Sequence, residues 1–285
     1  TVYNRLDTAM VTEFTGYDGK PVTDAKVIAL VANNEVADTA SAGDEVSVFL
    51  DRTPFYAESG GQIGDNGTIK TEMGLVNVTD CIKVIGGKIA HIGTVAEGSI
   101  SVGDTAVAEI DRVRRLSTSR NHSATHLLQK ALRTVLGTHV EQAGSYVTPD
   151  RLRFDFTHFA PMTPEEIQQV EDIVNEKILE SLPITATQES IEDARKLGAM
   201  ALFGEKYGNI VRVVNMGGYS IELCGGAHLD NTAQVGSFKI ISESGIASGV
   251  RRIEALTGAA ALKHYQQQEE ALKAVCKAVK AAPAN

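Results

Sequence analysis

The chain has 285 residues, of which 43% are apolar, and it carries a formal charge of −9. That length and apolar share are enough for a large core and favour two domains. No apolar run approaches the length of a membrane span, and the first residues are not typical of a secretory signal. Because the chain starts at Thr1 rather than Met, we interpret it as a piece of a longer protein.

Charge and cysteine usage bound the class of protein further. An acidic total is unusual for a nucleic-acid-binding domain, although arginines gather locally between residues 112 and 120. This cluster fits either a phosphate strand or a solvated helix face. The three cysteines, Cys81, Cys224 and Cys276, are odd in number and far apart. They argue against a disulfide framework and for a reducing compartment, so we expect a cytoplasmic location.

Residues 1–110 are typical of short β-strands separated by turns. Apolar, β-branched runs alternate with turn formers such as Asp65-Asn66-Gly67 and Gly86-Gly87, and this spacing predicts a small β-barrel. The runs lie at residues 9–15, 25–32, 46–50, 75–79, 88–92 and 106–110. The glycine-rich stretch 58–65 fits neither the Walker pattern of nucleotide-binding loops nor the glycine pattern of dinucleotide-binding folds. It predicts either a closely packed loop or a flexible lip over a site in the second domain.

From residue 114 the pattern becomes helical, with an apolar stripe ending near Gly137. A strand pair follows at 140–147 and 151–156, and Thr163, Pro164 and Glu166 then predict a capped helix. Further strands are expected at 184–189, 210–214, 219–223, 237–242 and 250–256, with a short helix at 191–197 and a last helix from 258 to about 280. The fold class is therefore α+β: an N-terminal small barrel, then helices on an antiparallel sheet, then a C-terminal helix.

Two pairs of possible metal ligands stand out. His122 and His126 are four apart in a helical pattern, so both rings leave one face. Cys224 and His228 are four apart on a glycine-rich corner. Each residue alone has an ordinary structural explanation, such as a buried thiol or a hydrogen-bonded imidazole. Together they form a tetrahedral ligand set that favours one zinc ion.

These motifs resemble the editing domain of alanyl-tRNA synthetases and their free-standing relatives. The resemblance rests on Asn121-His122-Ser123-Ala124-Thr125-His126-Leu127-Leu128 with Cys224-Gly225-Gly226-Ala227-His228. It extends to 55–62, to Gln142-Ala143-Gly144-Ser145, to Phe203-Gly204-Glu205-Lys206-Tyr207-Gly208 and to 249–255, and so covers nearly the whole chain. Threonyl-tRNA synthetases share the two ligand pairs but not the long glycine-rich barrel.

The resemblance implies three regions. They are a β-barrel domain with the glycine-rich loop at 1–110, a zinc-dependent editing domain at 111–257, and the start of a C-terminal helical oligomerisation region at 258–285. It also implies an aminoacyl-tRNA hydrolase acting on alanine tRNA charged with serine or glycine, as part of a synthetase whose ATP-dependent core is absent here. No membrane partner is implied.

The same resemblance suggests roles for individual residues. Thr125 and Gln142 would hydrogen-bond the serine hydroxyl, and backbone donors at Gly225 and Gly226 would stabilise negative charge. For tRNA binding it suggests Gly60, Gly61 and Arg251, although Arg251 fits a structural ion pair equally well. Four protein ligands close a zinc site, which favours an organising role, whereas displacement of His228 would open a place for water.

Other readings stay open at this point. A free-standing trans-editing deacylase would have the same chemistry. A zinc-stabilised RNA-binding module would bind tRNA without hydrolysing it. A metallopeptidase is disfavoured, because His-Ser-Ala-Thr-His lacks the glutamate that serves as base in the helical zinc motif.

Overall fold

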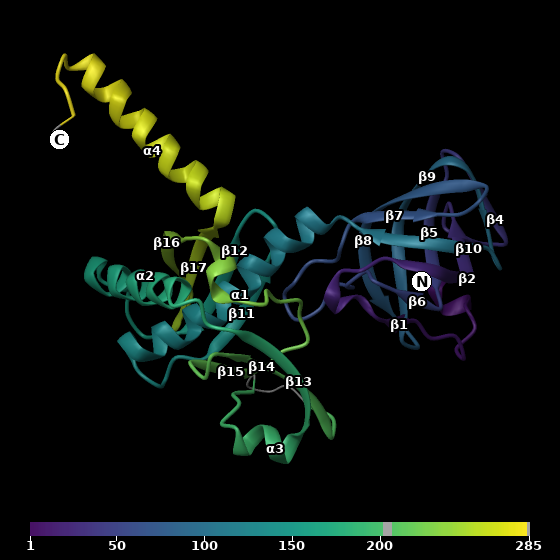
Figure 1. Cartoon of the computed structure of the whole chain (residues 1–285), viewed down its shortest axis with the longest axis horizontal. Coiled ribbons are helices and arrows are strands. Elements are labelled where there is room, and N and C mark those ends of the chain that lie inside the picture. The colour runs from purple at the N-terminus through teal and green to yellow at the C-terminus, as the bar shows by residue number, and fades with distance from the viewer. Residues whose placement is uncertain (202–206, 284–285) are drawn as a thin grey trace. The chain divides into compact units, whose positions relative to one another are not determined.

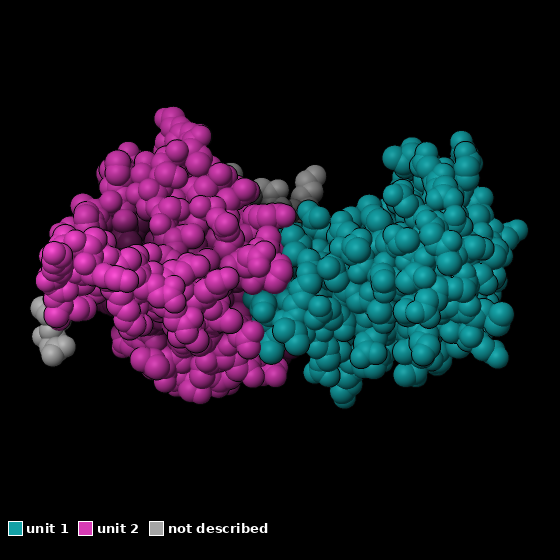
Figure 2. All heavy atoms as spheres, turned by 90° about the horizontal axis from the view of Figure 1, so that it is seen from above, with its two compact units in different colours: residues 1–118, 225–227 teal, residues 119–224, 228–285 magenta. Residues whose placement is uncertain are grey.

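A computed structural model describes residues 1–201 and 207–283. Most of the expected motif at 203–208 therefore lies outside the described residues. The chain divides into two compact units, coloured separately in Figure 2. Unit 1 comprises Thr1–Thr118 and Gly225–Ala227, and unit 2 comprises Ser119–Cys224 and His228–Asn285.

Unit 1 is a closed antiparallel barrel, as the strand spacing predicts. The ring runs β10-β7-β8-β9-β5-β2, and pairing of β10 with β2 closes it. Its strands are β2 (Val22–Ala32), β5 (Glu45–Leu50), β7 (Gly67–Lys70), β8 (Gly74–Val84), β9 (Lys88–Ser101) and β10 (Thr105–Ile110). Apolar side chains that alternate along these strands fill the interior, among them Leu30, Ile69 and Val76.

Short elements decorate the barrel. They are η1 (Val2–Arg5), β1 (Glu13–Phe14), η2 (Gly16–Asp18), β3 (Glu35–Ala37), β4 (Thr39–Ser41) and β6 (Arg52–Thr53). The run at 9–15 yields only the two residues of β1, whereas β8 and β9 extend well beyond their apolar runs. Because β8 and β9 pair along most of their length, backbone hydrogen bonds continue these strands through polar sequence.

A buried arginine ties together three loops of unit 1. Arg115 donates from Nε and Nη2 to the carboxylate of Asp65, from Nη2 also to the carbonyl oxygen of Pro54, and from Nη1 to the carbonyl oxygen of Gly16. Both charged side chains are less than 8% exposed. The same unit holds residues 225–227, where Tyr17 donates to the Gly225 carbonyl at 2.7 Å.

Unit 2 contains two antiparallel sheets and the helices that pack on them (Figure 1). One sheet has the order β11-β12-β17-β16 and the other β13-β14-β15. The strands are β11 (Gln142–Val147), β12 (Leu152–Thr157), β13 (Ile184–Ser190), β14 (Ile210–Met216), β15 (Ser220–Leu223), β16 (Phe238–Ala247) and β17 (Val250–Thr257). The helices are α1 (Arg112–Leu136), which starts in unit 1, α2 (Pro164–Leu179), α3 (Ile191–Lys196), η3 (Thr232–Val235) and α4 (Gly258–Ala278).

The core of unit 2 lies between α1, α2 and the four-stranded sheet. Leu127 and Leu128 of α1 are fully buried in one cluster with Phe154 of β12 and Phe238 of β16. The predicted capping box at the start of α2 is confirmed, since Thr163 and Glu166 each bond the other's backbone nitrogen.

Helix α4 extends away from the rest of unit 2 in Figure 1. Ala261 is its buried residue among those described, while Leu262, Leu272 and Val275 are each more than half exposed. In the described part of the chain, none of the helices is long and apolar enough to cross a membrane.

Candidate functional site

Four potential metal ligands converge inside unit 2, as the two spaced pairs predict. His122 and His126 lie one turn apart on α1, with ring centroids 5.4 Å apart. Cys224 directly follows β15, and His228 is four residues further along. The ligand atoms of these side chains all lie within 4.8 Å of one another.

Each of the three imidazole rings presents its Nε2 atom to this cluster. The sulfur of Cys224 is 3.2 Å from Nε2 of His228 and 3.5 Å from Nε2 of His122. Nε2 of His126 is buried and has no hydrogen-bond partner among the described residues. Buried polar atoms without a partner are uncommon, so this nitrogen points to a bound group.

The donor set fits zinc. Zinc bonds of about 2.0 Å to nitrogen and 2.3 Å to sulfur, at tetrahedral angles, put such donors roughly 3.6 Å apart. The two measured sulfur–nitrogen distances, 3.2 and 3.5 Å, are close to that separation. Three imidazoles and one thiolate also match the borderline softness of the ion.

The charges in the cluster favour a thiolate. Burial alone would raise the pKa of the Cys224 thiol, but the neighbouring His122, His228 and His126 lower it well below its usual value. Burial would likewise lower the pKa of His126, yet the charges of Glu222 and Cys224 raise it to about 10. These charges therefore favour the deprotonated sulfur, which is the form that binds metal.

A second layer of contacts holds the outer nitrogens of two of the rings. Nδ1 of His126 lies 3.2 Å from the Glu222 carboxylate, and Nδ1 of His228 lies 3.1 Å from the hydroxyl of Ser123. Both partners are buried. Contacts of this kind orient metal-binding imidazoles.

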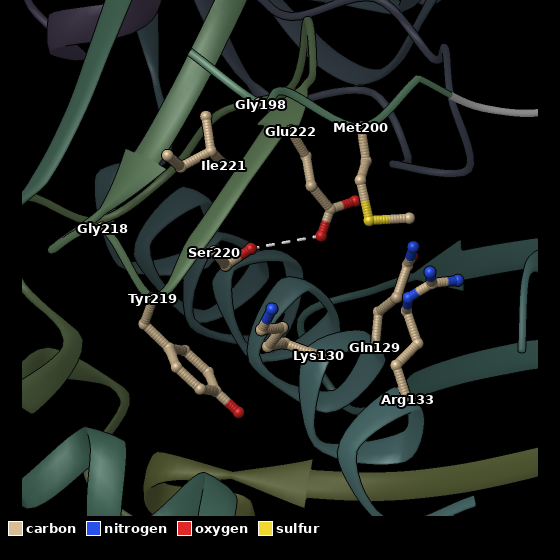
Figure 3. A pocket seen from close by; sticks show the side chains of 10 residues that line it. All are labelled: Gln129, Lys130, Arg133, Gly198, Met200, Gly218, Tyr219, Ser220, Ile221 and Glu222. Carbon is tan, nitrogen blue, oxygen red and sulfur yellow. Dashed lines mark hydrogen bonds between the residues drawn. The ribbon is translucent and has the colours of Figure 1, made fainter. Parts of the chain in front are cut away.

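A cavity opens beside Glu222, on the same face of α1 (Figure 3). Gln129 and Arg133 continue the row of His122 and His126 along the helix, and Tyr219 and Met200 are among the other residues that line the cavity. Gln129 is only 4% exposed. The cavity therefore adds an amide, a guanidinium and a carboxylate next to the ligand cluster.

The structure places Thr125 in the cluster's immediate surroundings. Thr125 is buried, and its hydroxyl donates to the carbonyl of His122 at 2.6 Å. Gln142 is half-buried at the start of β11, opposite Phe156. Neither residue lines the cavity of Figure 3.

The remaining candidate residues lie elsewhere. Arg251 pairs through two nitrogens with the carboxylate of Glu243, within unit 2. Gly60 and Gly61 form a turn of unit 1 with φ of 58° and 83°, a conformation that glycine adopts without strain. Gly225 and Gly226 also belong to unit 1.

Several residues of the site were not predicted. Glu222 is two residues before Cys224, a spacing that places both on one face of an extended segment but does not show which ring the carboxylate contacts. Outside the cluster, the rings of His139 and His158 share a 2.8 Å hydrogen bond, although the two residues are 19 apart in the sequence. No spacing rule could have joined that pair, because it depends on how a loop after α1 meets the end of β12.

Comparison with known proteins was consistent along the whole chain. Residues 1–114 match the family "tRNA synthetases class II (A)", and residues 211–254 match "Threonyl and Alanyl tRNA synthetase second additional domain". The chain is 57% identical over 284 residues to an alanine–tRNA ligase of Acetivibrio thermocellus, covering 100% of the chain and 32% of that protein. It is 54% identical over 270 residues to the ligase of a Thermoanaerobacter species (95% and 31%), and 52% identical over 255 residues to that of Bacillus velezensis (90% and 29%). The chain thus spans about a third of the length of these relatives.

Proposed function

This chain belongs to the alanyl-tRNA synthetase family, and we propose that it hydrolyses the ester bond of alanine tRNA wrongly charged with serine or glycine. The observation that carries the proposal is the buried set of His122, His126, Cys224 and His228 beside a polar cavity. Burying several ionisable groups together costs free energy that apolar side chains at the same positions would not cost. Such a cluster therefore indicates a functional site rather than an ordinary core.

The need for such a hydrolase has a physical cause. A synthetic pocket sized for alanine cannot exclude the smaller glycine, and it discriminates only about 100-fold against a side chain that adds a hydroxyl. A second site must then select the wrong product and spare alanine. Hydrogen bonding can do this for serine, because a buried polar group left unpaired costs about 1–3 kcal/mol.

Within the site, we assign the hydroxyl-reading role to Thr125 and Gln142. The Thr125 hydroxyl donates its hydrogen bond to the His122 carbonyl. Its oxygen can therefore accept a hydrogen bond from a serine hydroxyl. Backbone N–H groups of Gly225 and Gly226 are proposed donors to the carbonyl oxygen of the ester. Gly60, Gly61 and Arg251 remain proposed contacts for tRNA.

Zinc is the cofactor that we propose for the cluster. When bound, the ion would fix Cys224 and His228 to α1 and supply positive charge beside the substrate. The chain's own side chains then orient the ester and exclude bulk water, which the low exposure of His122 and Thr125 supports.

Three further proposals concern the setting of the activity. We propose that residues 1–110, 111–257 and 258–285 serve as barrel, editing and oligomerisation regions. The exposed apolar side chains of α4, such as Leu262 and Leu272, support packing against another helix in the full-length protein. A cytoplasmic location agrees with the cysteines, which form no disulfide in the described part of the chain.

The test is deacylation of alanine tRNA charged separately with serine, glycine and alanine. We expect the zinc-loaded chain to release serine and glycine at least 10-fold faster than alanine, and the Cys224→Ser variant to lose this activity. Binding of all three tRNAs without release of any amino acid would contradict the proposal and would favour an RNA-binding module.

A further inference from the structure

Glu222 lies behind the metal-ligand cluster, in the interior of β15. It pairs with Val214 of β14 and is 6% exposed. Because side chains alternate along a strand, Glu222 lies on the same face as Cys224, two residues later. One strand end therefore brings a thiolate and a carboxylate to the same histidine.

The carboxylate of Glu222 is held in place from two sides. Oε1 lies 3.2 Å from Nδ1 of His126. The same oxygen accepts a hydrogen bond of 3.2 Å from the hydroxyl of Ser220, drawn as a dashed line in Figure 3. A buried carboxylate can only accept hydrogen bonds while it is ionised. It therefore requires a proton on Nδ1 of His126, so a metal that displaces the other ring proton would bind through Nε2.

That orientation matches the state of the other ring nitrogen. Nε2 of His126 is the buried atom without a partner among the described residues, and it faces the cluster. A ring turned to present Nδ1 inward would put Nε2 next to the carboxylate instead. The Glu222 contact thus selects which nitrogen is available as a ligand.

The second histidine with an outer partner provides a contrast. The hydroxyl of Ser123 accepts a hydrogen bond from the backbone nitrogen of Leu229 and lies 3.1 Å from Nδ1 of His228. This partner is a hydroxyl, whereas Glu222 offers a carboxylate. A charged acceptor makes the stronger hydrogen bond and increases the donor strength of the opposite nitrogen more.

We propose that Glu222 is a positioning residue, which fixes the Nδ1–H tautomer and the ring orientation of His126 so that Nε2 binds the metal. This inference rests on the zinc site of the proposed function. Glu222 is not itself a ligand, because its contact with His126 is on the Nδ1 side, away from the cluster.

Zinc affinity tests the role directly. We expect Glu222→Leu to weaken zinc binding roughly 10- to 100-fold, as loss of outer carboxylates typically does. Glu222→Gln keeps the shape and one carbonyl acceptor, so an intermediate loss is expected. The matched control is Gln129→Ala, which removes a side chain from the same cavity that is not one of the metal ligands, and it should leave zinc affinity unchanged. Competition with a chromophoric chelator gives the dissociation constants.

The tautomer itself can be observed by ¹⁵N NMR of the zinc-loaded wild-type chain. We expect His126 to show a protonated Nδ1 and a metal-shifted Nε2. If the Glu222→Leu variant does not fold, the Glu222→Gln variant and this spectrum still test the positioning role. Wild-type zinc affinity in both variants, or zinc on Nδ1 of His126, would overturn the inference. A wild-type chain that binds no zinc would overturn the proposed metal site as well, whereas failure of deacylation alone would leave the positioning role intact.

Discussion

His122 and Cys224 are 102 residues apart in the sequence, yet Nε2 of the first lies 3.5 Å from Sγ of the second. His122 lies on α1, a helix that the local apolar pattern favours. Cys224 directly follows β15, a strand that depends on pairing with β14. The sheet therefore completes the ligand set, so the metal should stabilise the folded state of unit 2 as well as its chemistry.

Replacing the thiol tests this coupling. Cys224→Ser removes the softest ligand, and we expect bound zinc to fall from about one equivalent to a small fraction in metal analysis after dialysis. Cys276→Ser, on α4, is the matched control, because this cysteine has no place in the cluster, and zinc should stay near one equivalent. Equal zinc content in both variants would contradict the assignment.

The hydroxyl-reading role of Thr125 gives a second prediction. Thr125→Val keeps the shape and removes the acceptor, so release of serine from alanine tRNA should slow about 10-fold or more, given about 1–3 kcal/mol for a lost buried hydrogen bond. Zinc content should not change. Thr125→Ser keeps the hydroxyl and should retain most activity. A Val variant with unchanged selectivity between seryl and alanyl tRNA would exclude this role.

Local patterns were enough to predict most elements of the fold. The capping box of Thr163 and Glu166 and the stripe of α1 depend on neighbouring residues, and both were predicted. β7 (Gly67–Lys70) was not, because four residues carry little periodicity and its pairing with β10 is long-range. The pairing of β10 with β2, which closes the barrel, also joins strands that are far apart in the sequence, so no local pattern predicts it.

The candidate site shows the same limit. Spacing of four joined His122 to His126 and Cys224 to His228, and ligand chemistry then joined the two pairs. The outer contacts of Glu222 and Ser123 could not be read this way, since a buried glutamate or serine has no characteristic spacing to the ring it supports. Only the packing of β15 and α1 reveals these contacts.

A third prediction concerns pH and the barrel. His91 is fully buried, and burial lowers its pKa to about 4, although a hydrogen bond with the Val48 carbonyl opposes the shift. An unfolded chain has an ordinary histidine pKa of about 6.5, so between pH 6.5 and 4 the unfolded state binds more protons. Barrel stability should thus be complete above pH 6.5 and fall by about 3 kcal/mol as the pH approaches 4.

Urea unfolding followed from pH 7.5 to 4 measures this effect. His91→Gln removes the titration while keeping polar atoms near Val48 and Thr53, so the variant should lose less stability over the same range. The difference between the two pH slopes is the contribution of His91. Identical slopes would show that other groups cause the acid sensitivity.

The last prediction concerns the buried pair of Arg115 and Asp65. Asp65→Ala would leave the guanidinium buried with only the carbonyls of Gly16 and Pro54, and loss of one partner of a buried pair costs about 3–5 kcal/mol. Hydrogen exchange of barrel amides should report this loss, because it resolves unit 1 from the rest of the chain.

The control is an ion pair of the same unit that is exposed to solvent. Arg5 and Glu35 form an ion pair at 3.2 Å with side chains 67% and 75% exposed, so Glu35→Ala should change barrel stability by less than about 1 kcal/mol. Both substitutions remove one carboxylate from one arginine, so the difference between them isolates burial. A similar small effect for Asp65→Ala would mean that water reaches Arg115 and replaces the carboxylate, and Arg115 would then not be what holds the three loops together.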